Sequence, residues 1–260
     1  MQNENKKFNS IEKAIQILLK FQEGRGDFGV RELSQELNFS PATVQRILQT
    51  LKSYHFVDQD DLSRQYFLGN VFYGFLQTLN DSNRVTRTAR RFMEEVAEKT
   101  QETVHLNIIE GGHRVCIYTI ESTRLLRAGM PLGHRSPLYA GASAKCLLAF
   151  ASPAFIENYL EATDIKPFTP NTIVDKKALE QELRLIRKQK YAASMGERTP
   201  GLDSVSVPVF NHTGTILASI SLAIPEIRFS QQEYLDNCIK VLVKAAEAFS
   251  EVMGYKEENR

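Results

Sequence analysis

The first seventy residues repeat a pattern of short apolar stripes separated by brief polar breaks. Asn9 with Glu12 three residues later has the form of a capping box at the start of a helix. Its apolar positions fall at offsets of three and four: Ile11, Ala14, Ile15, Leu18 and Leu19. A second stripe begins at Val30, and a third follows Ser40-Pro41, a good N-cap with proline at the first helical position. The spacing predicts three short amphipathic helices.

The pattern changes from helical to extended after His55. Two short apolar runs, Phe56-Val57 and Tyr66–Leu68, flank a polar stretch from Asp58 to Ser63, which predicts a β-hairpin. Three helices with a tight connection between the second and third, followed by a hairpin, is the order of a winged helix-turn-helix. The third helix would then enter the major groove of DNA.

The rest of the chain mixes helical and alternating patterns. An apolar-rich helix is predicted from Val71 to about Leu79, and the polar residues 80–83 break the chain. Expected helices span residues 85–100, 140–151 and 153–161. Asp175 is expected to cap a further helix, and Ser230 with Glu233 a closing helix. The expected strands are residues 103–109, 114–121, 191–195, 204–210 and 215–224. This order predicts an α+β domain with an antiparallel sheet flanked by helices.

Composition sets limits on the class of protein. The 260 residues favour two domains, and 32 basic against 31 acidic side chains leave a charge of +1. The first seventy residues carry nine of each sign, so DNA binding must rest on local arrangement rather than on net charge. Without an apolar run of membrane-spanning length, we expect a cytoplasmic protein with no membrane partner.

Motifs for catalysis or metal binding are weak. Gly24–Gly29 has the spacing of a dinucleotide-binding loop, but a helix rather than a strand precedes it. His105, Cys116 and Cys146 could supply zinc ligands, yet they lack the spacing of a zinc site. We expect no catalytic residue, no metal and no cofactor. An enzyme, or a zinc-dependent sensor on the second domain, is the alternative.

The third predicted helix carries side chains suited to base edges. Arg46 can pair with guanine, and Gln45 and Gln49 can pair with adenine. Ala42 and Thr43 can contact a thymine methyl group. The expected DNA-binding residues are Ser40, Ala42, Thr43, Gln45, Arg46, Gln49 and Arg64.

The chain resembles the IclR-type bacterial transcriptional regulators over nearly its whole length. The N-terminal match runs through Ser10–Ala14, Glu32-Leu33, Ser40–Leu51 and Tyr66–Gly69. The C-terminal match runs through Glu102–Leu106, Leu126-Arg127, Pro131–Gly133, Pro137–Ala140, Ala144-Lys145, Thr172-Ile173, Gly201–Val209 and Ser219–Pro225.

The resemblance implies a DNA-binding transcription regulator controlled by a small metabolite. Its winged helix-turn-helix would span residues 1–69, a linker helix residues 70–83, and a GAF-like effector-binding and oligomerisation domain residues 84–260. The partners implied are a double-stranded DNA operator, a small organic effector and further copies of the chain, as a homodimer or homotetramer.

The resemblance also places effector contacts on particular residues of this chain. They are Leu125, Ala128, Ala142, Ser143, Ser194, Ser204, Ser221 and Ala223. None is charged, and hydroxyls both donate and accept hydrogen bonds. We therefore expect a ligand with carboxylate or hydroxyl oxygens, and expect a multiply charged ligand to be disfavoured because unpaired buried charge is costly.

Overall fold

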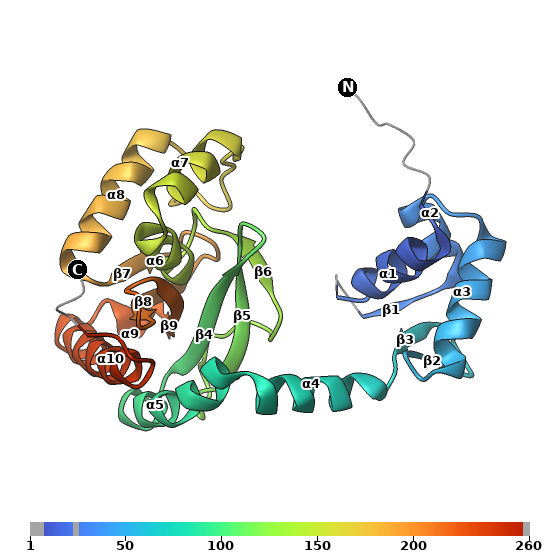
Figure 1. The fold of residues 1–260 in the computed structure, drawn as a ribbon, viewed down its shortest axis with the longest axis horizontal. Helices are drawn as coiled ribbons and strands as arrows, with labels where there is room; N and C mark the ends of the chain where they lie inside the picture. The colour runs from blue at the N-terminus through green and yellow to red at the C-terminus, as the bar shows by residue number, and fades with distance from the viewer. Residues whose placement is uncertain (1–7, 23–25, 257–260) are drawn as a thin grey trace. The chain divides into compact units, whose positions relative to one another are not determined.

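The computed structural model describes residues 8–22 and 26–256 and divides into two compact units, residues 1–82 and 83–260. The N-terminal unit is a winged helix-turn-helix, as the sequence predicts (Figure 1). Its helices are α1 (Ser10–Lys20), α2 (Val30–Leu37), α3 (Pro41–Ser53) and α4 (Val71–Ser82). Its strands β1 (Asp27–Phe28), β2 (Val57–Gln59) and β3 (Tyr66–Leu68) form an antiparallel sheet in the order β1-β3-β2.

Local signals set the ends of these helices. The Asn9 side chain accepts a hydrogen bond from the Glu12 backbone N–H, and the Glu12 carboxylate accepts one from the Asn9 N–H, completing the predicted capping box. Ser40 caps α3 by accepting from the Thr43 N–H. Asn38 ends α2 in the left-handed conformation, with φ of 54°. Each cap satisfies backbone groups that a helix end leaves free.

Two features of this unit differ from the sequence interpretation. Asp27–Phe28 forms a short strand against β3, where only a loop is expected. The loop residues Gly24 and Arg25 lie outside the described residues. Helix α4 continues through residues 80–82, which we expected to break the chain, and Asn83 caps the next helix instead.

The C-terminal unit is built on one six-stranded antiparallel sheet in the order β6-β5-β4-β9-β8-β7. The strands are β4 (Thr103–Glu110), β5 (His113–Ile120), β6 (Arg135–Pro137), β7 (Ala192–Met195), β8 (Leu202–Phe210) and β9 (Ile216–Pro225). The helices are α5 (Arg84–Thr100), α6 (Ala142–Phe150), α7 (Pro153–Ala162), α8 (Lys176–Gln189), α9 (Glu226–Phe229) and α10 (Gln232–Val252). The α+β class is therefore confirmed.

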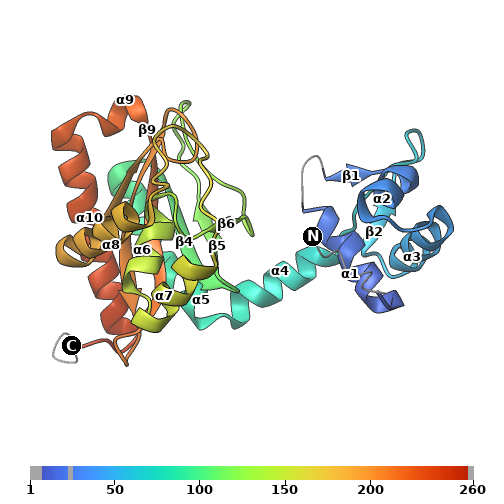
Figure 2. The ribbon, with the colours of Figure 1, turned by 90° about the horizontal axis from the view of Figure 1, so that it is seen from above.

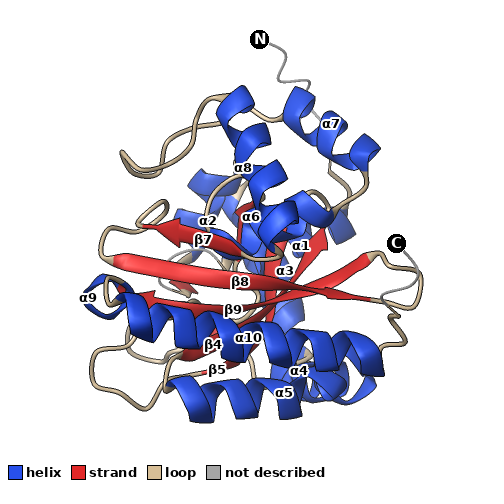
Figure 3. Cartoon of the chain, turned by 90° about the vertical axis from the view of Figure 1, so that its left-hand side faces the viewer, coloured by secondary structure: helices blue, strands red, loops and turns tan. Residues whose placement is uncertain are grey.

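Helices cover both faces of this sheet. Figure 3 shows α5 and α10 on one side and α6, α7 and α8 on the other. On β9, Ile220, Leu222 and Ile224 belong to the apolar core under α5 and α10. Ser219, Ser221 and Ala223 alternate with them and so lie on the opposite face, and all three are buried. The sheet thus has one apolar face and one buried face of small or polar side chains.

The sequence pattern did not predict the two shortest elements of this unit. Strand β6 and helix α9 span three and four residues and carry no period that a sequence pattern could show. Ser230 was expected to cap the closing helix, but it is the C-cap of α9, and α10 begins after Gln231. Among the helices of the described residues, none combines the length and the apolar character that crossing a membrane requires.

The close approach of Gly69 to the backbone of His55 can be tested by substitution. A Cβ at this position would lie 2.0 Å from the backbone oxygen of His55, so Gly69→Ala should destabilise the N-terminal unit by about 3 kcal/mol, the upper end of overpacking costs. Gly74→Ala in α4 is the matched control, because its Cβ meets nothing within 4 Å and alanine favours a helix. Thermal unfolding of the two variants measures the difference. Equal stability of Gly69→Ala and the parent would contradict the close approach.

Candidate functional site

Helix α3 presents the predicted DNA-binding side chains on its solvent side. Ser40, Ala42, Arg46 and Gln49 are exposed, while Val44, Ile47 and Leu48 on the opposite side belong to the core. Thr43 is half-buried and lies 2.8 Å from the Ser40 hydroxyl. The start of α3 is therefore both capped and open to a partner.

A groove of about 600 Å³ lies between α3, the start of α2 and the hairpin. Gln45 and Gln49 of α3 meet Arg64 of the hairpin in its lining, and Gln45 also donates to the Tyr66 hydroxyl at 3.3 Å. The groove is lined by Gly29, Val30, Arg31, Gln45, Gln49, Lys52, Gln59, Ser63, Arg64 and Tyr66. Three of these are cationic and none is acidic, so the groove suits a polyanion. Figure 2 gives a second view of these helices and strands.

The C-terminal unit encloses a cavity of about 240 Å³ on the polar face of its sheet. We call this the effector cavity. Its lining is His105, Arg114, Gly129, Met130, Pro131, His134, Ala140, Gly141, Ala142, Ser143, Ser194, Arg198, Thr199, Leu202, Ser204, Ser221, Leu222 and Ala223. Six of the eight expected effector contacts are in that lining. The other two, Leu125 and Ala128, are not, and Leu125 is fully exposed.

The lining of the effector cavity also contains charged side chains that are not among the eight expected contacts. Arg114 and Arg198 line the cavity together with the imidazoles of His105 and His134, and no Asp or Glu does. The charged side chains come from segments outside the matched effector positions. Their presence favours an anionic ligand instead of disfavouring one.

Arg114 is buried without a carboxylate partner in the described structure. It is 2% exposed, its Nη1 donates to Asn107 Oδ1 at 3.3 Å and contacts the Met130 sulfur, and its Nε has no hydrogen-bond partner. Burial, together with the nearby charge of Arg198, lowers the Arg114 pKa to about 10. A buried guanidinium without a counter-ion costs free energy that an anion would recover.

His105 lies beside Arg114 on the same face of the sheet. Its Nδ1 is 3.0 Å from the Thr119 hydroxyl, and its Nε2 is buried without a partner. Burial, and secondarily the positive charge of Arg114, lowers the His105 pKa to about 4. The imidazole is therefore neutral at pH 7 in the ligand-free cavity.

Helix α6 begins at the wall of the cavity. Gly141, Ala142 and Ser143 line it, and Gly141 adopts φ of 91°, a conformation that favours glycine. The first backbone N–H groups of a helix lack intrahelical partners and carry positive partial charge. The start of α6 thus adds to the positive potential of the cavity.

A buried ion cluster holds the start of α6 in place. Lys145 is 1% exposed, and its Nζ lies 2.5 Å from Glu197 Oε1 and 2.8 Å from Glu182 Oε1. The other oxygen of Glu197 accepts the Gly141 N–H at 2.9 Å. The Glu197 and Glu182 carboxylates are therefore engaged by Lys145 and by the helix, and neither lines the cavity.

Ser221 has a structural role besides lining the cavity. Its hydroxyl accepts from the Asn107 amide at 3.0 Å and lies 3.0 Å from the Ser206 hydroxyl. Removing that hydroxyl would leave the Asn107 amide without this partner. Substitution of Ser221 therefore tests packing as well as ligand contact.

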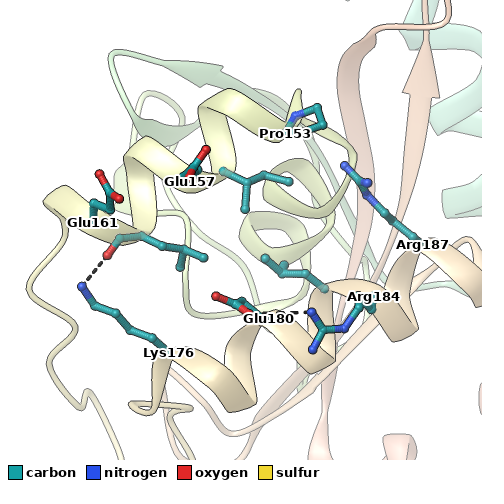
Figure 4. Close-up of a pocket in the computed structure, with 10 residues that line it drawn as sticks. Pro153, Glu157, Glu161, Lys176, Glu180, Arg184 and Arg187 are labelled. Carbon is teal, nitrogen blue, oxygen red and sulfur yellow. Dashed lines mark hydrogen bonds and ion pairs between the residues drawn. The ribbon is translucent and has the colours of Figure 1, made fainter.

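A second cavity, of about 510 Å³, lies between α7 and α8 (Figure 4). Glu157, Glu161 and Glu180 face the same space as Lys176 and Arg184. Glu180 and Arg184 approach to 3.7 Å, and Lys176 donates to the Leu160 carbonyl. The mixed charges give this cavity no preference for one sign of ligand.

The zinc alternative has no geometric support in the part of the chain that the structure describes. No group of three His, Cys, Asp or Glu there is placed to hold a metal ion. Cys116 Sγ lies 3.7 Å from His105 Nδ1, whereas Cys146 is on α6, where full burial raises its thiol pKa. A thiol held protonated is a poor metal ligand.

Comparison with models of known families shows which family the chain belongs to. The IclR helix-turn-helix domain matches residues 10–61, and the bacterial transcriptional regulator IclR C-terminal domain matches residues 77–251. The chain belongs to the IclR family. It is a DNA-binding transcription regulator, and its winged helix and GAF-like sheet domain are those of the family.

Individual relatives agree with the IclR assignment along the chain. The HTH-type transcriptional regulator KdgR of Escherichia coli K12 is 34% identical over 96% of this chain and 94% of its own length. The structure of an IclR-family regulator from Alicyclobacillus acidocaldarius matches with a TM-score of 0.85 and 27% identity, covering 94% of this chain and 98% of that one. An IclR homologue from Microbacterium hydrocarbonoxydans, solved with 4-hydroxybenzoate, matches with a TM-score of 0.81 and 19% identity, covering 94% and 99%.

The charged residues of the IclR effector cavity are the ones that sequence reasoning missed. Arg114 is the clearest case, because β5 alternates and places Arg114 and Cys116 on the polar face. An arginine at a buried position of an alternating strand is a signal that could have been found. Arg198 carries no such signal, since it lies in a loop whose position depends on the Glu197 contact.

The lowered pKa of His105 makes the stability of this regulator pH-dependent. Its folded-state pKa lies below the unfolded value, so the unfolded state takes up the proton first as pH falls below about 6.5. The free energy of unfolding should drop by about 3 kcal/mol between pH 6.5 and 4 from this group alone. Titration of the His105 imidazole by NMR, assigned with His105→Gln, measures the pKa. A midpoint near 6.5 would show that the side chain is not buried as described.

Proposed function

We propose that this IclR-family regulator reads a double-stranded operator with α3 and the hairpin, and that a small metabolite in the effector cavity controls the binding. The observation that carries the proposal is the cavity lined by two arginines in a chain whose other unit exposes a capped α3 beside a cationic groove. A ligand acts on DNA affinity only if it binds one arrangement of the protein better than another.

The roles on DNA follow from exposure and hydrogen-bonding capacity. The exposed Arg46 guanidinium makes no hydrogen bond or ion pair within the described residues, so it is free to reach a base. Gln45 and Gln49 offer amides to adenine, and Ala42 and Thr43 lie at the start of α3, which enters the groove first. Ser40, Arg31 and Arg64 are placed for phosphates.

The metabolite proposal rests on the cavity and, at the level of fold alone, on the relative solved with 4-hydroxybenzoate. Ser143, Ser194 and Ser204 supply hydroxyls, and Ala142 and Ala223 cover apolar parts of the ligand. The expected contacts Leu125 and Ala128 have no place in this cavity in the structure described.

We further propose that the protein catalyses no reaction and acts in the cytoplasm. Relatives such as KdgR are named transcriptional regulators, which supports a regulatory role without turnover. Bacterial DNA lies in the cytoplasm, so a protein that binds an operator acts there. No element of the proposed mechanism needs a cofactor.

Self-association is the remaining part of the proposal. Helix α1 exposes Ile11, Ile15 and Leu19 at four-residue spacing, with Ile11 73% exposed. Tyr73 and Leu79 of α4 are also exposed. An apolar stripe of this kind is stabilised when a second copy covers it, and a homodimer presents two α3 helices to a symmetric operator. A homotetramer would pair two such dimers.

Arg46→Ala tests the proposed DNA function. If Arg46 holds a guanine, operator affinity should fall by about 1 to 3 kcal/mol per half-site, and preference at that base should relax. Fluorescence anisotropy with the operator and with single-base variants measures both effects.

Two further variants serve as comparisons for the Arg46→Ala result. Arg31→Ala, in the groove, should weaken binding evenly across sequences and reduce the salt slope by about one. Arg90→Ala, exposed on α5, should change neither quantity. Unaltered operator affinity in Arg46→Ala would exclude Arg46 from the DNA-binding surface.

Ile15→Glu tests the proposed dimer. A carboxylate in the α1 stripe should raise the dimer dissociation constant by about tenfold or more, because its charge would lose water in the interface. Leu62→Glu is the matched control, since Leu62 is 95% exposed in the hairpin and outside the stripe. Analytical ultracentrifugation measures the association. Unchanged association of Ile15→Glu would place the interface elsewhere.

A further inference from the structure

We propose that the effector cavity selects a dicarboxylate, with Arg114 and Arg198 as the residues that determine this specificity. The inference rests on the proposed function, in which the same cavity receives the effector, and it adds the chemical class of that effector. It follows from two arginines at the cavity wall, one on each of two cationic regions, and from the lack of any carboxylate in the lining.

The first cationic region combines the start of α6 with Arg198. A Cβ on Gly141 would lie 3.3 Å from Arg198 Cδ, so the arginine stem packs directly against the first residue of the helix start. The guanidinium carbon lies 5.2 Å from the centre of the Phe168 ring, and its buried Nε has no hydrogen-bond partner. A carboxylate here would meet backbone N–H groups and a guanidinium together.

The second cationic region combines the Arg114 guanidinium with the neutral His105 imidazole. Both side chains are at most 2% exposed, and each has a buried nitrogen with no partner, Nε of Arg114 and Nε2 of His105. They lie on the neighbouring strands β5 and β4. His134, with its buried Nδ1 also unpartnered, lines the same cavity. One buried carboxylate would pair with the guanidinium and accept a hydrogen bond from the histidine.

These two regions come from different strands of the sheet, although the charge of Arg198 is near enough to lower the Arg114 pKa. Arg114 is on β5, and Arg198 follows β7, with β4, β9 and β8 between those strands in the sheet order. The stretch of cavity wall between them carries Ser204, Ser221 and Ala223. A ligand with an anionic group at each end and a short middle section matches this distribution.

The protein itself does not neutralise either guanidinium. Among the described residues, Glu197 and Glu182 bind Lys145, and neither arginine has an ion-pair partner. A monocarboxylate brings one negative charge to two buried guanidinium groups, so one of them keeps no counter-ion. That residual cost favours a ligand with two anionic groups over a monocarboxylate.

The volume limits the length of the ligand. A cavity of about 240 Å³ lies below the roughly 300 to 1,000 Å³ of pockets that hold drug-sized ligands, which favours a short ligand. A dicarboxylic acid of about four to six carbons is a ligand of this kind.

The test measures binding of simple acids to the full-length protein without DNA. Malonate, succinate, glutarate and adipate are compared by calorimetry and thermal unfolding with monocarboxylates of the same carbon number and with inorganic phosphate, at constant ionic strength. We expect one of the four- to six-carbon dicarboxylates to bind at least about tenfold more tightly than its matched monocarboxylate and than phosphate.

Variants then identify the two determinants. Arg114→Met and Arg198→Gln should each lower dicarboxylate affinity by at least about tenfold and reduce the preference over the monocarboxylate. Arg114→Met should not lower the unfolding temperature of the ligand-free protein, since it removes an unpaired buried charge; a merely structural arginine would lower it. Arg184→Met, in the cavity between α7 and α8, is the control and should bind as the parent does.

Several outcomes would overturn the proposal: equal binding of monocarboxylate or phosphate, absence of dicarboxylate binding, or full binding by Arg114→Met. Because the assay contains no DNA, failure of operator binding leaves its result intact. Conversely, dicarboxylate binding that does not alter operator affinity would overturn control by the cavity and would leave the ligand class standing.

Discussion

The organisation of the C-terminal unit depends on burying both faces of one sheet when only one face is apolar. Alternation along β4, β8 and β9 sends Val104, Val205 and Leu222 into the core under α5 and α10. The intervening residues are mainly polar, and α6 with its flanking loops covers them. Each buried polar group then needs a partner. Ser221 hydrogen-bonds to both Asn107 and Ser206, and Asn107 accepts from Arg114. At the effector cavity, Arg114 Nε, Arg198 Nε and His105 Nε2 have no partner among the described residues.

The same burial explains why Lys145 needs two carboxylates. A lysine at 1% exposure is costly unless it is paired, and Glu197 and Glu182 pair it from the loop after β7 and from α8. Because Glu197 also accepts the Gly141 N–H, one carboxylate fixes both the charge and the first residue of the α6 start. Neither of these two carboxylates lines the cavity, so the Lys145 cluster leaves the charges of Arg114 and Arg198 there uncompensated.

Local sequence signals were sufficient for most elements and for part of the site. The Asn9 and Ser40 caps and the alternation of β4, β8 and β9 are short-range features, and the structure confirms the elements they predict. The effector-cavity hydroxyls followed from the resemblance. Arg114 could have been found from the alternation of β5, whereas Arg198 could not, because its burial depends on a contact between the loop after β7 and α6. Leu125, placed by the same resemblance, is exposed and outside the cavity lining, so its contact with a ligand stays a prediction.

The loop before β6 links the effector cavity to the rest of the unit. It contributes Gly129, Met130, Pro131 and His134 to the lining, so a ligand at Arg114 meets this loop directly. Its earlier part is held where Arg228 binds the buried Glu102 through Nε and Nη2, and Nη2 also donates to the Leu126 carbonyl at 3.0 Å. Glu102 stands between the end of α5 and the start of β4. A ligand that favours one position of this loop therefore acts on a segment tied to α5. Because such coupling is reciprocal, a change in the position of α5 that alters the loop must alter the affinity for the ligand to the same extent.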